Sequence, residues 1–282
     1  SEVRSAEGRV RKQIMFYFSK NKVLQLDQKS MDYVTFGKGK KSLVIIPGLG
    51  DGLQTVKGMA QMLALTYREF AKVYKVYVFS RINKLPENYT TRNMAADVAD
   101  AMDALGLKSS AVMGISQGGM IAQWLAVDFP EKVDRLILAV TTPKLGDLGR
   151  ERISRWLDLS QTGTYKELMF DIASHSYTTK SFGRFKYLYQ IMGIFGRIKD
   201  KQRIAIQAIS CLRHDSMAVL EKINCPTLVI GAEEDDVLGV EASLELHHHI
   251  KDSQLTILPE CGHALYEQNK DFQKRVLVFL ES

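Results

Sequence analysis

The stretch Gly114-Ile115-Ser116-Gln117-Gly118-Gly119 follows an apolar run and opens a segment with helical spacing. A G-x-S-x-G match carries weight in this strand–turn–helix context. A nucleophile on so sharp a turn sits in strained backbone, so the residues two before and two after it must be very small, as Gly114 and Gly118 are. Gly119 lets the helix approach the sheet closely. The turn therefore predicts a Ser116 hydroxyl raised above a strand end, near the positive end of a helix, rather than a plain glycine-rich turn.

Around this turn the chain alternates short β-branched runs with longer helical ones, which favours an α/β architecture. Strands are expected at 23–26, 33–36, 41–46, 74–79, 110–115, 136–140, 227–230 and 255–258, and helices at 55–66, 91–105, 118–128, 241–248 and 267–280. From about residue 143 the pattern becomes helical, aromatic and basic. We therefore expect a mostly parallel sheet flanked by helices, with a core domain of residues 1–143 and 223–282. Residues 144–222 are expected to form a helical cap, or lid, inserted after the sixth core strand.

The composition is that of an ordinary globular protein, with 282 residues of which 45% are hydrophobic and 25% charged. No apolar run approaches the roughly 18 residues that a transmembrane segment needs. The polar first residues lack the apolar centre of a signal peptide. Cys211, Cys225 and Cys261 are widely spaced and odd in number, which argues against a disulfide framework. These features predict a cytoplasmic protein.

A serine hydroxyl becomes a strong nucleophile only when a base removes its proton, so Ser116 requires a histidine and an acid that orients it. With this type of turn the expected chain order is serine, acid and histidine, each following a strand. Four consecutive acidic residues, 233–236, follow the strand at 227–230, and Gly262-His263 follows the strand at 255–258. Both required partners are therefore present in the expected order.

Together these motifs resemble those of capped serine hydrolases of the α/β-hydrolase superfamily, over nearly the whole chain. The resemblance extends to Pro47-Gly48-Leu49-Gly50, which follows the third strand, and to the sequence GHALYE, which precedes the last helix. It implies Ser116 as nucleophile, His263 as general base and Asp235 as the orienting acid. Asp235 fits best because the family places the acid just ahead of a short run such as 236–239. Asp236 is the main rival, and Glu234 fits less well.

The resemblance further implies an oxyanion hole formed by the backbone N–H groups of Leu49 and Gln117. The sequence departs from the family at Pro47, where histidine is commoner before Gly48. The donor is a backbone group, so catalysis need not suffer. Any hydrogen bond by which that histidine braces the loop is, however, missing.

Other candidate residues favour structural roles. The run 247–249 is three histidines, but consecutive residues of a helix point about 100° apart and cannot all face one metal ion. His175 and His214 fall in the expected cap, where a structural role outweighs a pocket role. Nothing near Cys261 would lower its pKa, so it is not expected to be a nucleophile. We expect no metal and no cofactor.

The net charge of +6 arises entirely in residues 144–222, which hold 14 Lys or Arg against 8 Asp or Glu. Most aromatic side chains there are expected to form the cap core, and the basic ones a solvated face. A sharper hypothesis is attraction of an anionic substrate. Nucleic-acid binding is not expected without a recognised module, and no pattern indicates an oligomeric state. The segment interleaves Tyr165, Phe170, Tyr177, Phe182, Phe185, Tyr187, Tyr189 and Phe195 with Lys166, Lys180, Arg184, Lys186 and Arg197.

The sequence thus predicts a hydrolase of a carboxylic ester or related acyl compound, with a small-molecule substrate and an acyl-enzyme on Ser116. Thioester, lactone, small-amide and carbon–carbon hydrolysis fit the same apparatus. Haloalkane and epoxide chemistry are disfavoured, because relatives that perform them carry Asp at the turn. Aminopeptidase-like or perhydrolase activity, a non-catalytic receptor that keeps the triad, and peripheral membrane attachment of the cap stay open.

Overall fold

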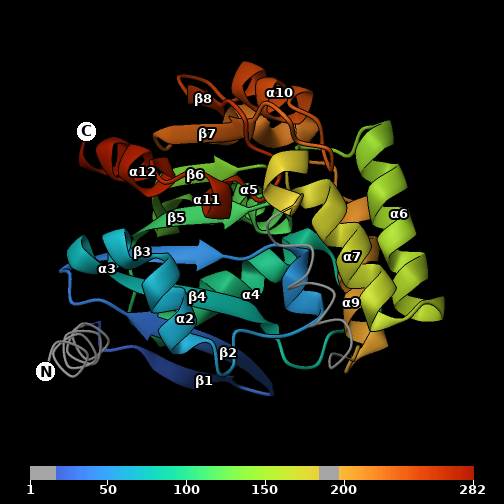
Figure 1. Ribbon diagram of the computed structural model, residues 1–282. Coiled ribbons are helices and arrows are strands. Elements are labelled where there is room, and N and C mark those ends of the chain that lie inside the picture. Colours follow the sequence, from blue (N-terminus) through green and yellow to red (C-terminus); the bar gives the residue numbers. More distant parts are fainter. Residues whose placement is uncertain (1–16, 184–196) are drawn as a thin grey trace, which may run out of the picture.

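An eight-stranded sheet forms the centre of the molecule in the computed structural model, which describes residues 17–183 and 197–282 (Figure 1). The strand order is β1-β2-β4-β3-β5-β6-β7-β8. The pairs β1–β2 and β2–β4 are antiparallel, and the five pairings from β4–β3 to β7–β8 are parallel. The mostly parallel sheet is confirmed. The strands are β1 Lys20–Leu26, β2 Lys29–Phe36, β3 Lys41–Ile46, β4 Tyr74–Ile82, β5 Ser110–Ile115, β6 Val133–Ala139, β7 Thr227–Ala232 and β8 Gln254–Leu258.

Helices cover both faces of this sheet. One apolar core packs α2, α3 and α12 against it, and a second packs α4, α5 and α10 against the opposite face (Figure 1). In β3, Leu43 and Ile45 enter the first core while Val44 and Ile46 enter the second. A strand buried on both faces is apolar throughout, which explains the continuous run at 43–46. The helices are α2 Ala60–Thr66, α3 Arg68–Val73, α4 Thr91–Ala104, α5 Gln117–Asp128, α10 Glu241–His249, α11 Leu265–Gln268 and α12 Phe272–Glu281, with 3-10 turns at η1 Leu49–Gly52, η2 Pro130–Lys132 and η3 Met217–Lys222.

Three further helices lie between β6 and β7 in the sequence, and we call them the inserted helices: α6 Asp147–Thr162, α7 Tyr165–Ser176 and α9 Lys201–Leu212. Figure 1 places them together beside one end of the sheet. A separate core holds them together, in which Trp156, Leu168 and Ile204 come from the three different helices. Helical structure after the sixth core strand, counted from β1, is as the sequence predicts.

Two helix predictions differ from the structure. The helix expected from residue 55 begins at Ala60, because Gly58 adopts a left-handed φ of +86° that a continuing helix excludes. The sequence predicts one final helix, but the structure has two, α11 and α12. Between them the Asn269 side chain accepts a hydrogen bond from the N–H of Asp271. Such a local side-chain bond competes with continuation of the helix. Within residues 17–183 and 197–282, no helix combines the length and apolarity that crossing a membrane requires.

Candidate active site

Ser116 occupies a strained turn between β5 and α5. Its φ of 53° and ψ of −120° lie outside the regions that most residues adopt. A Cβ atom added at Gly114 would lie 2.4 Å from the Gly118 carbonyl oxygen, and one at Gly118 would lie 1.9 Å from the last carbonyl oxygen of β3. A Cβ at Gly119 would lie 2.5 Å from the Thr141 side chain. All three glycines are therefore required by close packing, as the sequence predicts.

The structure brings Ser116, His263 and Asp235 together at the carboxyl ends of β5, β8 and β7. The Nε2 atom of His263 lies 2.9 Å from the Ser116 Oγ. Its Nδ1 atom lies 2.9 Å and 3.1 Å from the two carboxylate oxygens of Asp235. With a carboxylate accepting at Nδ1, the neutral imidazole carries its proton there, so Nε2 is free to accept the proton of the Ser116 hydroxyl.

The surroundings of Asp235 keep it ionised. Burial of this carboxyl would raise its pKa. The charge and hydrogen bond of His263 and the backbone N–H groups of Leu238 and Val237 outweigh burial and lower the pKa below its ordinary value. Those two N–H groups donate to Oδ1 at 3.0 Å and 2.9 Å. The loop after β7 thus both points the carboxylate at His263 and stabilises its negative charge.

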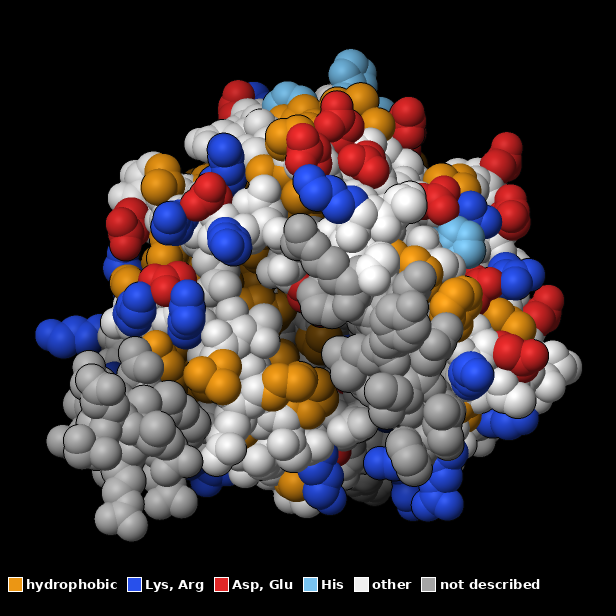
Figure 2. Space-filling view, viewed as in Figure 1, with side chains coloured by type: hydrophobic (Ala, Val, Ile, Leu, Met, Phe, Trp, Pro, Cys, Tyr) orange, Lys and Arg blue, Asp and Glu red, His pale blue; other side chains and the backbone are white. Residues whose placement is uncertain are grey.

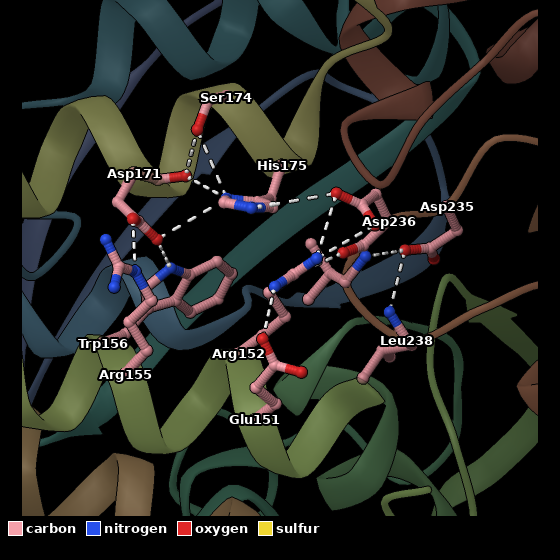
Figure 3. Close-up of polar contacts among 11 residues, drawn as sticks. Glu151, Arg152, Arg155, Trp156, Asp171, Ser174, His175, Asp235, Asp236 and Leu238 are labelled. Carbon is pink, nitrogen blue, oxygen red and sulfur yellow. Dashed lines mark hydrogen bonds and ion pairs between the residues drawn. The ribbon is translucent and has the colours of Figure 1, made fainter. Parts of the chain in front are cut away.

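The neighbouring acids point elsewhere. Figure 3 shows Asp236 between Arg152 of α6 and His175 of α7, while Asp235 turns toward the backbone of its own loop. Asp236 accepts hydrogen bonds from Arg152 Nη2 at 3.2 Å and 3.3 Å, and Glu234 is exposed. Of the acids that the sequence leaves open, Asp235 is the one brought to His263.

Leu49 and Gln117, the expected oxyanion donors, each begin a helical turn. Leu49 is the first residue of η1 and Gln117 the first of α5, so neither N–H has an acceptor within its own helix. The loop before η1 lies close to the nucleophile, since a Cβ at Gly48 would be 3.2 Å from the Ser116 Cβ. Both N–H groups therefore belong to segments that flank the Ser116 hydroxyl.

Arg81 lies beside these segments and escaped the sequence analysis. Its Nη2 donates to the Pro47 carbonyl oxygen at 2.6 Å and to the Gln117 Oε1 at 2.9 Å. The bracing bond expected to be missing at Pro47 thus has a counterpart from another element. The available signal was a charged residue two positions after the expected strand 74–79; β4 continues to Ile82 and buries it.

A pocket of about 430 Å³ opens onto Ser116 and His263 between α2, α7 and α11. Figure 2 shows hydrophobic side chains gathered in a hollow on the face where these elements lie. Of the lining residues that the structure describes, Asp51 and Glu267 are the acidic ones, and none is Lys or Arg. Apolar lining comes from both the sheet side and the inserted helices, and includes Leu63, Val78, Trp156, Met169 and Ile172.

The remaining histidines and the cysteines have structural surroundings. His247, His248 and His249 are exposed at the end of α10, and the described residues contain no cluster of potential metal ligands. His214 is buried, its Nδ1 lies 2.9 Å from the Thr91 Oγ1, and burial lowers its pKa to about 4. Burial raises the pKa of Cys261, which is not the environment of a reactive thiolate. The three cysteines form no disulfide.

The aromatic and basic side chains of the insertion follow the expected division only in part where they are described, because Phe170 is exposed and Arg203 is buried. Tyr177 and Phe182 pack against Ala173 and Ala264, and Tyr165 lines the pocket. Lys166, Lys180 and Arg197 are exposed. The others, Phe185, Tyr187, Tyr189, Phe195, Arg184 and Lys186, lie outside the described residues.

Comparison with known proteins agrees with this fold. The profile of a family described as "alpha/beta hydrolase fold" matches residues 41–167. The 3-oxoadipate enol-lactonase 2 of Acinetobacter baylyi (strain ATCC 33305 / BD413 / ADP1) is 25% identical over 88% of this chain and 91% of its own. The 2-hydroxy-6-oxo-6-phenylhexa-2,4-dienoate hydrolase of Comamonas testosteroni is 25% identical over 93% and 95%. The solved enol-lactonase from Burkholderia xenovorans LB400 shares the fold, with a TM-score of 0.80, 19% identity and coverage of 93% of this chain and 100% of its own.

Proposed function

Because the chain belongs to the α/β-hydrolase superfamily and is a hydrolytic enzyme, we propose that it cleaves a carboxylic ester or related acyl compound through a serine acyl-enzyme. The contact that carries the proposal is the unbroken line from the Ser116 Oγ through His263 to the Asp235 carboxylate, with both links at 2.9 Å. A carboxylate, an imidazole and a hydroxyl in this order activate the hydroxyl as a nucleophile.

The chemistry follows from these contacts. Ser116 Oγ attacks the substrate carbonyl carbon as its proton passes to His263 Nε2. Asp235 stabilises the resulting imidazolium through Nδ1. The N–H groups of Leu49 and Gln117 stabilise the oxyanion. His263 then gives the proton to the leaving alcohol. A water molecule that His263 deprotonates releases the acid, and the proton returns to Ser116.

The pocket supports an apolar acyl group. Its described lining is dominated by aliphatic and aromatic side chains and contains no Lys or Arg, and its acid Asp51 is paired with Arg203. Such a lining favours a neutral, compact acyl chain. Residues 144–222 would act as a cap over the core formed by 1–143 and 223–282, since Trp156, Tyr165 and Met169 contribute to the pocket wall. Steering of anionic substrates by the basic insertion stays a prediction, tested by the salt dependence of kcat/KM for matched neutral and anionic esters.

A series of nitrophenyl esters with increasing acyl length tests this function. The wild type should turn over short and medium apolar chains, with kcat/KM falling once the chain outgrows the pocket. Ser116→Ala should lose at least about 10⁴-fold in kcat. Ser116→Ala with wild-type activity would refute the nucleophile, and a wild type inactive on every ester and unreactive to a fluorophosphonate would refute the proposed chemistry.

Carbon–carbon bond hydrolysis is a second candidate. The likeness to the Comamonas testosteroni hydrolase, whose name specifies a dienoate substrate, favours it. The described pocket lining offers no Lys or Arg to pair with such a carboxylate. Assay of that dienoate beside the ester series separates the candidates. A higher kcat/KM for the dienoate would select the second.

A further inference from the structure

We propose that Arg81 is a positioning residue that holds the two halves of the oxyanion hole in register. This proposal rests on the proposed function, because it assigns Arg81 a role toward the oxyanion that forms during ester cleavage. Arg81 lies on β4, outside the line of Ser116, His263 and Asp235.

One nitrogen atom makes the connection. Nη2 of Arg81 donates both to the carbonyl oxygen of Pro47 and to the side-chain oxygen of Gln117. Pro47 leads through Gly48 into the Leu49 N–H, and Gln117 carries the other N–H on its own backbone. The two donors lie in segments that follow the neighbouring strands β3 and β5, beyond their last paired residues Ile46 and Gly114, so a contact between these segments constrains the spacing of the donors further. A charge-assisted bond to each loop supplies that tie.

Stability alone is a poor explanation for this arginine. It is among the largest fully buried side chains, and its Nε and Nη1 atoms have no hydrogen-bond partner among the described residues. A buried cation with incomplete hydrogen bonding destabilises a fold relative to an apolar side chain of similar volume. A role in preorganising the site accounts for a residue that the packing itself does not favour.

The same network connects the tie to the inserted helices. The Asp51 Oδ2 accepts hydrogen bonds from Arg203 Nη2 of α9 at 2.6 Å and from Gln207 Nε2 at 3.1 Å. It also accepts one from the backbone N–H of Arg81 at 3.3 Å. The Gln117 Nε2 in turn donates to the Gln207 carbonyl oxygen at 2.9 Å. Helix α9 is thereby bonded to both loops that carry the oxyanion donors.

The charges of this network also suit an oxyanion. Arg81 and Arg203 are two cations, and the Asp51 carboxylate accepts from the Arg203 guanidinium and from the backbone N–H of Arg81. These three residues together carry one net positive charge, and Arg81 brings it into contact with the Gln117 side chain, next to Ser116 in the sequence. In a buried site, a fixed positive charge stabilises negative charge that develops nearby.

Kinetics of Arg81→Met test the proposal, with Arg92→Met as the matched control because Arg92 forms an exposed ion pair with Asp128. Activity is expressed per site titrated to completion with a fluorophosphonate, so loss of folded protein does not count as loss of catalysis. We expect kcat per site to fall about 10²-fold, near the effect of one lost oxyanion donor, with KM little changed. The Ki of a boronic acid, which forms a tetrahedral adduct on the serine, should rise by a similar factor.

If Arg81→Met yields no folded protein, Gln117→Met takes its place, because it removes one acceptor of the tie and keeps the backbone N–H. It should lower kcat per site about tenfold with KM unchanged. Wild-type kcat per site and wild-type boronate Ki in the folded variant would overturn the positioning role. Failure of the proposed function is a different result, since the wild type itself would then lack ester turnover and fluorophosphonate labelling.

Discussion

The inserted helices meet the core through two ion pairs of the same chemistry in opposite surroundings. Arg203 of α9 bonds Asp51 at 2.6 Å, with 7% and 0% of the two side chains exposed. Arg152 of α6 bonds Asp236 at 3.2 Å, with 15% and 56% exposed. A buried carboxylate that loses its partner is strongly destabilising, whereas an exposed pair contributes little. The buried junction, Arg203 with Asp51, should therefore contribute strongly to stability. The exposed junction, Arg152 with Asp236, should contribute little.

Each junction lies next to a group that the proposed mechanism uses. Asp51 is two residues after Leu49, and Asp236 directly follows Asp235. A change in the buried pair should therefore reach the oxyanion hole. The exposed pair should leave the triad undisturbed, because Asp235 is held by the N–H groups of its own loop.

The largest expected effect is the difference in kcat between variants of the adjacent acids Asp235 and Asp236. Asp235→Asn keeps the shape but no longer stabilises the correct imidazole tautomer, so kcat should fall about 10⁴-fold. Asp236→Asn is the matched control and should stay within about twofold, because its carboxylate contacts Arg152 and His175 instead. Steady-state ester kinetics measure both. The reverse ranking would mean that Asp236 is the catalytic acid.

At the buried junction, Arg203→Met should lower the free energy of unfolding by about 3–5 kcal/mol, because Asp51 is left as an uncompensated buried charge. Urea unfolding measures the loss. Adding Asp51→Asn to Arg203→Met should restore part of it. A loss below about 1 kcal/mol in the single variant would show that the α9 junction is no stronger than an exposed pair.

Acid should lower the free energy of unfolding through His214, which is buried next to α9. Burial lowers the pKa of His214, just after α9, from 6.5 to about 4. Between these two pKa values, His214 is protonated in the unfolded chain but remains neutral in the folded protein. The free energy of unfolding should therefore fall as the pH drops from 6.5 to about 4, by about 3 kcal/mol from this residue. Urea unfolding across this range should give a flatter curve for His214→Gln, and identical slopes would contradict the burial effect.

The smallest effect belongs to the exposed pair itself. Arg152→Met should change the free energy of unfolding by less than about 1 kcal/mol and leave ester kcat close to wild type. Thermal unfolding and the ester assay, run beside Arg203→Met, complete the comparison. A loss as large as that of Arg203→Met would remove the distinction between the junctions.

The parts of the site that local backbone geometry dictates could be predicted from the sequence. Gly114 and Gly118 are required by the turn that carries Ser116, and the histidine follows a strand in the expected order. The choice between Asp235 and Asp236 stayed open, because adjacent side chains differ only in the direction that the folded loop gives them.

Arg81 could not be found in this way. Its partners Pro47 and Gln117 are 34 and 36 residues away, and its burial depends on β4 continuing past the apolar run. The brief helix α3 was missed for a related reason, since six residues at 68–73 are too few to establish a helical period. Contacts made across the fold were thus the unpredictable part, and local patterns the predictable one.

The most direct test of the central claim is rapid-quench mass spectrometry during turnover of a nitrophenyl ester. We predict that the acyl group appears on the peptide that contains Ser116, and that it is absent from Ser116→Ala. Ester turnover with no acyl group on that peptide, or with the acyl group on another residue, would contradict the proposal that Ser116 is the nucleophile.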